Sequence, residues 1–144
     1  MTHSLQFYLP IGVIVFCNVF YHICTKAVPA QINPFFTLVV TYIVGAAFAL
    51  ILFFATSPSK DLLLQAKALN WAPFILGLTI VGLEVGFIFL YRVGWNISIG
   101  SLVCNIALSI ILIFVGILLY KEVLTVSQII GIVLCIGGLV FINK

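Results

Sequence analysis

Charged side chains are scarce in this chain of 144 residues, which has six basic and three acidic residues. Only 6 % of the residues are charged and 65 % are hydrophobic, whereas an average soluble domain is about 25 % charged and about 45–50 % apolar. Because a soluble fold needs a charged surface, this composition excludes the soluble classes and, despite the formal charge of +3, nucleic-acid binding. The abundance of apolar side chains also excludes intrinsic disorder.

Paired cysteines and a signal peptide are missing as well. No Cys-x-x-Cys pair occurs, and each cysteine lies in an apolar run, so we expect small core or helix-contact residues and no disulfide frame or zinc site at Cys17, Cys24, Cys104 and Cys135. Before the first apolar run only His3 and the amino terminus can carry positive charge, and no clear Ala-x-Ala site follows. We therefore expect a retained helix there. With no metal set and no cluster of nucleophile, base and acid, we expect neither a cofactor nor an enzyme.

Long apolar runs predict an all-α membrane protein with five transmembrane helices, forming a single domain over residues 1–144. The runs are continuous, near the roughly 20 residues that a spanning helix needs, and too long for barrel strands. The expected helices cover residues 8–24, 35–56, 71–91, 97–120 and 126–142. Asn33-Pro34 predicts the start of the second helix, and Thr125 is the expected cap of the last.

The longest loop carries a further segment and part of the positive charge. Residues 59–69, with a possible cap at Ser59, predict an amphipathic helix that lies on the membrane. Five spans would put three cations on each side: Lys60, Lys67 and Lys121 with the N-terminus, and Lys26, Arg92 and Lys144 opposite. The positive-inside rule then favours neither orientation, which is compatible with insertion both ways. Alternatively, six cations are too few for their balance to carry information.

Polar residues recur at helical spacing on four of the five expected helices. Because polar groups inside a bilayer usually face a bundle interior or a wet cavity, we expect these helices to surround a cavity lined by Asn18, Tyr21, Thr25, Thr41, Tyr91, Ser98, Ser101 and Asn105. Alternatively, the serines and threonines bond only to their own backbone carbonyls. The last helix instead has a face of small residues, Gly131, Cys135 and Gly138, which predicts helix packing or a dimer contact.

Two titratable residues are the candidates for substrate binding or proton coupling, Glu84 and His22. A carboxyl deep in a membrane helix costs a few kcal/mol, and such groups are functional by default. Glu84 can take a proton from one side and release it when a cation displaces it; alternatively, it is hydrogen-bonded for packing or paired with Arg92 of a neighbouring subunit. His22 titrates near neutral pH when unperturbed; alternatively, it is a neutral ring bonded to Asn18.

From Glu84 to the C-terminus, the chain resembles the end of an EamA-type repeat of the drug/metabolite transporter superfamily. The family pattern combines an aromatic-rich helix and a long apolar helix with G-E-x-L-T and I-G-x-x-L-I-x-x-G-V. Here it takes the form Lys121-Glu122-Val123-Leu124-Thr125, followed by the segment from Gly131 to Gly138. The first half also fits the repeat, so the resemblance covers nearly the whole chain.

Two positions depart from the related patterns. Small multidrug resistance proteins, which are similar, carry an essential first-helix glutamate eight residues before a lysine, where this chain has Asn18 before Lys26. The proline usual in the fourth helix of EamA repeats is also absent, with Ala107 to Ser109 in its place. Glu84 is our candidate for the missing carboxylate because of its own position in the third helix; the family pattern does not assign it that role.

The resemblance implies a partner and a function. A single five-helix repeat would pair with a second copy as an antiparallel homodimer of ten helices in the inner membrane of a prokaryote. The dimer would be a secondary transporter that moves a small organic metabolite or cation by alternating access with proton coupling. The alternative is a membrane subunit of a heteromeric transporter or lipid-linked-substrate system that needs a partner chain. A passive channel is a third possibility.

Overall fold

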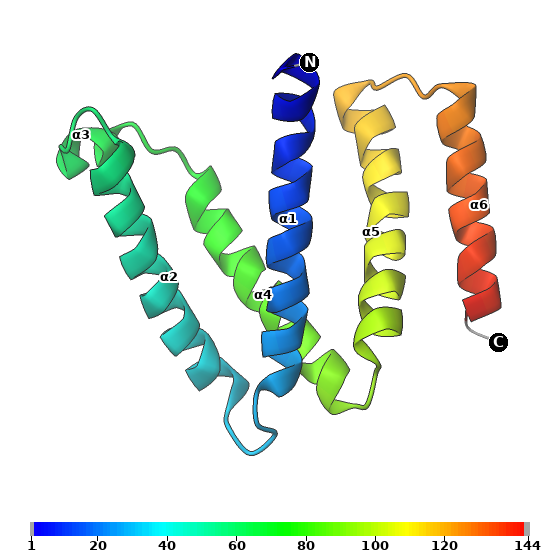
Figure 1. The fold of residues 1–144 in the computed structure, drawn as a ribbon, viewed down its shortest axis with the longest axis horizontal. Helices are drawn as coiled ribbons and strands as arrows, with labels where there is room; N and C mark the ends of the chain where they lie inside the picture. The colour runs from blue at the N-terminus through cyan, green and yellow to red at the C-terminus, as the bar shows by residue number, and fades with distance from the viewer. Residues whose placement is uncertain (1, 143–144) are drawn as a thin grey trace. The chain divides into compact units, whose positions relative to one another are not determined.

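Regular structure in the described part of the chain is helical. The computed structural model describes residues 2–142, with side chains described from residue 7 onward except at positions 136, 139, 140 and 142; Lys144, counted above among the cations, lies outside the described residues. Figure 1 shows the helices in chain order: α1 (Thr2–Ala27), α2 (Pro34–Thr56), α3 (Leu62–Lys67), α4 (Ala72–Arg92), α5 (Ile97–Tyr120) and α6 (Val126–Ile142).

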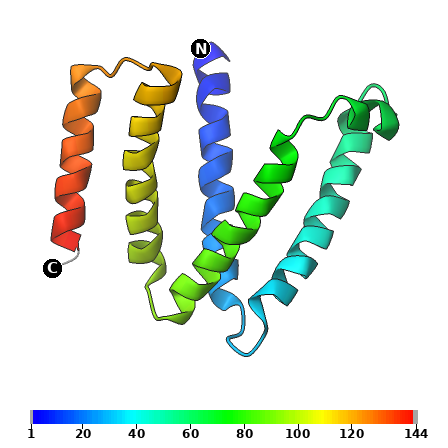
Figure 2. The same cartoon turned by 180° about the vertical axis from the view of Figure 1, so that it is seen from behind.

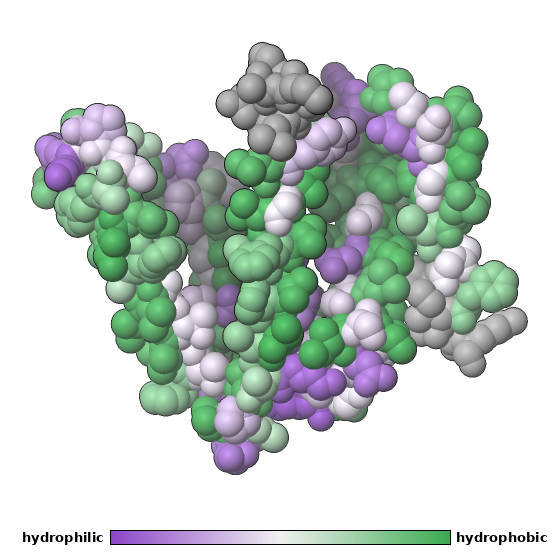
Figure 3. Space-filling view, in the orientation of Figure 1, coloured by the Kyte–Doolittle hydropathy of each residue, from purple (hydrophilic) through white to green (hydrophobic). Residues whose placement is uncertain are grey.

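Four of these helices, α1, α2, α4 and α5, are long and apolar enough to cross a membrane. The last helix, α6, is apolar and has 17 residues, which is the lower limit of spanning lengths. In Figure 3 the hydrophobic colour runs along the helices and the hydrophilic colour gathers mainly near their ends. Large apolar side chains such as Phe36, Phe48 and Leu118 are exposed on the single chain. The chain is therefore an all-α membrane protein, whose apolar surface is suited to lipid.

Local capping signals set several of the helix ends. The Asn33 side chain accepts a hydrogen bond from the Phe35 N–H, with Pro34 as the first helical residue, which confirms the predicted start of α2. At α6, the Thr125 N–H donates to Gln128 Oε1 at 2.7 Å and the Gln128 N–H donates to Thr125 Oγ1 at 3.4 Å. This reciprocal capping box confirms Thr125 as the cap.

Two sequence expectations about helix ends are wrong. The short helix in the long loop is capped by Asp61, whose carboxylate accepts from the Leu63 and Leu64 N–H groups, and Ser59 lies outside it. An aspartate just before free N–H groups is a stronger cap than a serine further back. The first helix extends to Thr2 instead of starting at residue 8, because polar residues end the apolar run without breaking the helix.

The chain separates into two compact units, Met1–Val93 and Gly94–Lys144. In the first unit, α4 packs against both α1 and α2. Figures 1 and 2 show α1 and α2 diverging from the loop that joins them, while α4 crosses α1 near the C-terminal end of α1. Because α4 contacts both neighbours, the side chains on its faces decide which polar groups of α1 and α2 come together.

The second unit is a hairpin of α5 and α6, which pack against each other. At the end of α5, Lys121 adopts a left-handed conformation with φ 54°, and the Glu122 N–H donates to the Gly116 carbonyl. The Glu122 carboxylate also folds over Gly116, where an added Cβ would lie 2.6 Å from Glu122 Oε2. The K-E-V-L-T segment of the sequence is thus the structural turn between the two helices.

Candidate functional site

A buried hydrogen bond joins α1 to α4. The Tyr91 hydroxyl lies 2.9 Å from His22 Nδ1, and both residues are buried. The Phe87 ring packs edge-on against the rings of His22 and Tyr21, with centroids 4.9 and 5.8 Å away. Phe87 and Tyr91 stand one turn apart on α4, so one face of that helix supplies both contacts. The crossing of α1 and α4 is therefore built from aromatic rings with one polar bond.

Charged residues surround the loop end of this crossing. Lys26 Nζ lies 5.9 Å from the centroid of the Tyr91 ring, a distance suited to a cation–π contact. Arg92 donates from Nη2 to the backbone carbonyls of Pro29 and Ile32, at 3.1 and 2.6 Å. The guanidinium group thus ties the end of α4 to the α1–α2 loop.

Two tyrosine hydroxyls from separate helices lie within electrostatic range of Glu84. The Glu84 carboxyl interacts electrostatically with Tyr21 on α1 and with Tyr42 on α2. Both phenolic oxygens are buried. Three helices therefore each contribute one polar group to the same region, which we call the Tyr21–Tyr42–Glu84 cluster.

Glu84 itself lies deep in its helix. It stands about 18 Å from the start of α4 and about 12 Å from the Arg92 end, so it falls in the middle third of a hydrocarbon core about 30 Å thick. In the part of the chain that the structure describes, no side chain forms an ion pair or hydrogen bond with it, and it is only partly buried. Arg92, the partner considered from a neighbouring subunit, is engaged by the loop carbonyls. Glu84 is thus a partly buried carboxyl without an ion partner among the described side chains.

The structure therefore brings together four of the residues expected from the sequence, Tyr21, His22, Glu84 and Tyr91. The alternative in which His22 bonds to Asn18 is wrong, because His22 is buried against α4 and bonds to Tyr91. Helical spacing placed Asn18 and His22 on one face of α1, but only the packing of α4 decided which neighbour the ring meets.

Other expected residues of the first unit lie apart from this cluster or are satisfied locally. Asn18 and Thr41 are exposed on the single chain. Thr25 Oγ1 donates to the Tyr21 carbonyl at 2.7 Å, and Thr41 Oγ1 donates to the Thr37 carbonyl at 3.0 Å. Their hydroxyl hydrogens are thus used within their own helices, as the alternative reading of membrane serines and threonines expected. Their role as cavity-lining residues stays a prediction.

The polar stripe of α5 lies in the second unit. Ser98 and Asn105 are exposed on the single chain, and Ser101 is partly buried. Ser101 Oγ donates to the Ile97 carbonyl at 2.6 Å, and Ser109 Oγ donates to the Asn105 carbonyl at 2.7 Å. The hydroxyl hydrogens of these serines are therefore also used within their own helix. A cavity shared with the residues of α1 and α4 stays a prediction.

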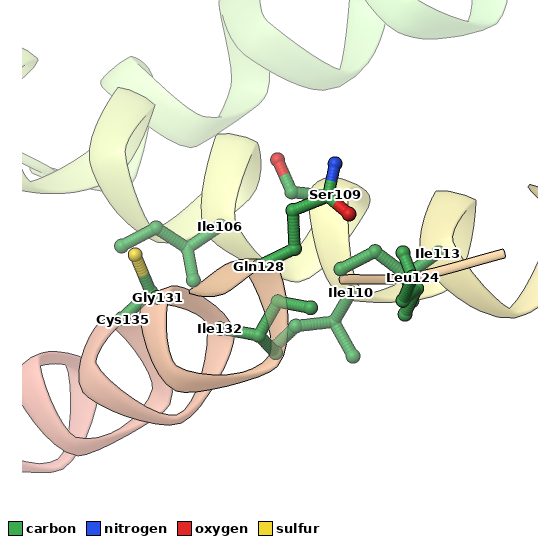
Figure 4. Close-up of a pocket in the computed structure, with 9 residues that line it drawn as sticks. All are labelled: Ile106, Ser109, Ile110, Ile113, Leu124, Gln128, Gly131, Ile132 and Cys135. Atoms are coloured by element: carbon green, nitrogen blue, oxygen red, sulfur yellow. The ribbon is translucent and has the colours of Figure 1, made fainter. Parts of the chain in front are cut away.

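A groove of about 350 Å³ runs between α5 and α6. Figure 4 shows that its lining is mostly isoleucine and leucine, with Ser109 and Gln128 as polar members and Gly131 and Cys135 on the α6 side. Gly131 and Cys135 therefore face α5, where their small size lets the helices approach. Gly138, the third small residue, is exposed.

Among the described residues, neither a metal-ligand group nor a disulfide bond is present. Over the residues that were described, no group of three or more His, Cys, Asp or Glu side chains is placed to hold a metal ion. The four cysteines are free thiols; Cys17, Cys24 and Cys135 are exposed on the single chain, and Cys104 is partly buried.

Sequence reasoning did not assign three residues that the structure brings to the site. Tyr42 is the only tyrosine in α2, whose other polar side chains are threonines; a single tyrosine within this apolar run was the signal that could have identified it. Phe87 shares a face with Glu84 and Tyr91 at spacings of three and four residues, but an aromatic residue in a membrane helix carries no distinguishing mark. Arg92 could be assigned to a helix end from sequence, but its carbonyl partners depend on the fold of the loop.

The model of the EamA-like transporter family matches residues 8–144. The chain belongs to the EamA-like transporter family. The match covers nearly the whole chain and confirms the resemblance to a drug/metabolite transporter repeat, and with it a membrane transporter. No curated protein and no solved structure shows significant similarity to the chain.

Proposed function

We propose that this EamA-like protein is a proton-coupled secondary transporter of a small organic metabolite or cation, and that Glu84 is its coupling residue. The observation that carries the proposal is the position of Glu84 in the middle of α4, where it has no ion partner among the described side chains. A carboxyl in such a place is stable as the protonated form and can exchange its proton for a cationic substrate.

The proposed assembly is an antiparallel homodimer in a prokaryotic inner membrane. Asn18 and Asn105 are exposed on the single chain although each lies within a membrane-length helix. Amide groups are costly in lipid, so a second chain that covers them would lower the free energy of the assembly. The even division of the cations supports opposite orientations of the two copies, and ten helices with inverted halves fit the general transporter architecture.

Proton flux in proteoliposomes tests this proposal. Liposomes that contain a trapped pH-sensitive dye and an acidic interior are exposed to a primary amine, a guanidinium compound and a quaternary ammonium compound in turn. Protein-free liposomes give the leak of each compound. We expect one or more of these cations to drive proton efflux through the unaltered protein, and Glu84→Gln to reduce that flux to the protein-free level.

Glu122→Gln is the matched control, because Glu122 is the other glutamate of the chain and lies in the exposed α5–α6 turn. Its flux should equal that of the unaltered protein. Undiminished coupled flux in Glu84→Gln would show that another group carries the proton.

A second candidate function is a membrane subunit that needs a different partner chain. The same exposed asparagines favour it, since either a second copy or another protein could cover them. The purified chain alone distinguishes the two: proton-coupled flux from protein expressed without any companion supports the homodimer, and flux that appears only with another subunit supports the heteromer.

A further inference from the structure

Burial in the first unit is concentrated at one end of its helices. Residues 7–20 of α1 and 72–79 of α4 are exposed on the single chain, and Figures 1 and 2 show α1 and α2 diverging away from the loop that joins them. Among the described side chains of this unit, the buried ones are His22, Leu38, Ile88 and Tyr91. All of them lie toward the α1–α2 loop, so the unit is packed at the loop end and open at the other.

Polar contacts made by two consecutive residues of α4 hold the packed end together. The Tyr91 hydroxyl lies 2.9 Å from His22 Nδ1, and Lys26 Nζ lies 5.9 Å from the centroid of the Tyr91 ring. The next residue, Arg92, donates from Nη2 to two backbone carbonyls of the α1–α2 loop. The end of α4 is thus fixed both to α1 and to the loop that follows it.

The contact between His22 and Tyr91 lies on the loop side of Glu84. Glu84 precedes Tyr91 by seven residues, which is about 10 Å along the axis of α4. In the opposite direction, α4 leads from Glu84 to the exposed residues 72–79. Within this unit, the region of Glu84 is therefore closed toward the α1–α2 loop and open toward the start of α4.

We propose that the hydrogen bond between His22 and Tyr91 is a gate contact, which must break before a substrate can pass between Glu84 and the loop side. The inference rests on the transporter function proposed above and adds the residues that control access. Alternating access requires one side of the site to be closed while the other is open. The structure then corresponds to the state that is closed on the loop side.

The chemistry of this contact suits a bond that breaks and re-forms. Polar contacts between membrane helices have a modest net strength, because the separated groups find other partners. His22 and Tyr91 lie within about two turns of the ends of their helices, so water at the membrane surface can replace the lost bond. Lys26 and Arg92 lie at the same helix ends, where long cationic side chains reach the interface.

Distance measurements between pairs of spin labels test the inference. Labels at Ala27 and Val93 report the loop end, and labels at Leu9 and Phe74 report the opposite end; all four positions are exposed on the single chain. The four native cysteines are replaced by alanine. Labelled chains are diluted with unlabelled chains in lipid nanodiscs, so that distances within one chain dominate.

We expect Tyr91→Phe and His22→Phe each to raise the ratio of long to short distances at the loop end about three- to tenfold, as expected for one polar contact between membrane helices. Both changes keep an aromatic ring and remove the bond, one from each side. Distances at the opposite end should not increase, because opening at a gate leaves the rest of the unit packed.

Tyr120→Phe is the matched control, because Tyr120 is 75 % exposed at the end of α5; its distances should equal those of the unaltered chain. An unchanged loop-end distribution in either gate variant would overturn the inference. Longer distances at both ends would also overturn it, since they would show that the bond only stabilises packing.

The distance measurements and the flux assay fail independently, because the distances are measured without substrate. Opening at the loop end in a protein that carries no proton-coupled flux would contradict the transporter proposal and leave the assignment of the opening contact in place. Coupled flux through a protein whose loop-end distances do not respond to the loss of the bond would overturn the gate alone.

Discussion

At the scale of single residues, the contact between His22 and Tyr91 is the most specific interaction between helices in the first unit. A hydrogen bond at 2.9 Å joins two buried side chains on α1 and α4. Because lipid offers no competing partners near a buried ring, losing the hydroxyl would leave a polar nitrogen unsatisfied. This bond thereby helps to hold α4 against α1.

Tyr91→Phe should lower the free energy of unfolding by about 1–2 kcal/mol, the range for a hydrogen bond between membrane helices with one partner left buried. The ring stays, so its contacts with Phe87 and Lys26 are kept. Unfolding by SDS in mixed micelles measures the change. Tyr8→Phe, at a tyrosine that is 64 % exposed, is the control and should have no effect. Equal stability of the two variants would show that the bond contributes nothing.

At the scale of elements, hydrogen bonds between residues close in sequence set several of the helix boundaries. Asn33, Asp61 and Thr125 each satisfy free N–H groups at the start of a helix. The end of α5 is different, because Lys121 has a left-handed backbone that glycine adopts without strain. The family pattern has glycine there, so this chain carries strain that the pattern avoids.

Lys121→Gly should therefore stabilise the protein by about 0.5–1 kcal/mol, since it removes the strain of a left-handed residue with a Cβ. The control is Lys60→Gly in the long loop, which removes the same charge where the backbone is not left-handed; it should be neutral or slightly destabilising. Both are measured by SDS unfolding. A loss of stability in Lys121→Gly would mean that the lysine side chain, and not the backbone, matters at this turn.

At the scale of the whole molecule, orientation in the membrane decides whether two copies can form one site. The cations are balanced, with Lys60, Lys67 and Lys121 on one expected side and an equal number on the other. A pair of C-terminal reporters, one active only inside the cytoplasm and one only outside, should therefore give comparable signals.

Replacing Lys60 and Lys67 by glutamine should make the number of cations unequal on the two sides, so that one orientation of the chain in the membrane is favoured. The side that holds the N-terminus would keep one of its cations, so it should face outward and the cytoplasmic C-terminal reporter should dominate. The same two reporters measure this shift. A signal from one side alone in the unaltered chain would contradict the antiparallel homodimer and point to an oppositely oriented partner.

Much of the fold could be predicted because it depends on local sequence. Apolar runs of spanning length must form helices, since only helices satisfy the backbone within each segment. Capping residues such as Asn33 and Thr125 act on N–H groups two or three positions away, so their effect is also visible in the sequence. Ser59 was a wrong choice because Asp61, a stronger acceptor, stood closer to the helix.

The sequence by itself therefore determined an apolar helical membrane protein of the EamA-like family, with a carboxyl at Glu84 in the middle of a helix. Only the tertiary structure decided which groups meet. Helical spacing fixes the face on which a side chain lies, but not the helix that this face will contact. Tyr42 joined Tyr21 and Glu84, and His22 bonded to Tyr91 instead of Asn18, because α4 packs against both α1 and α2.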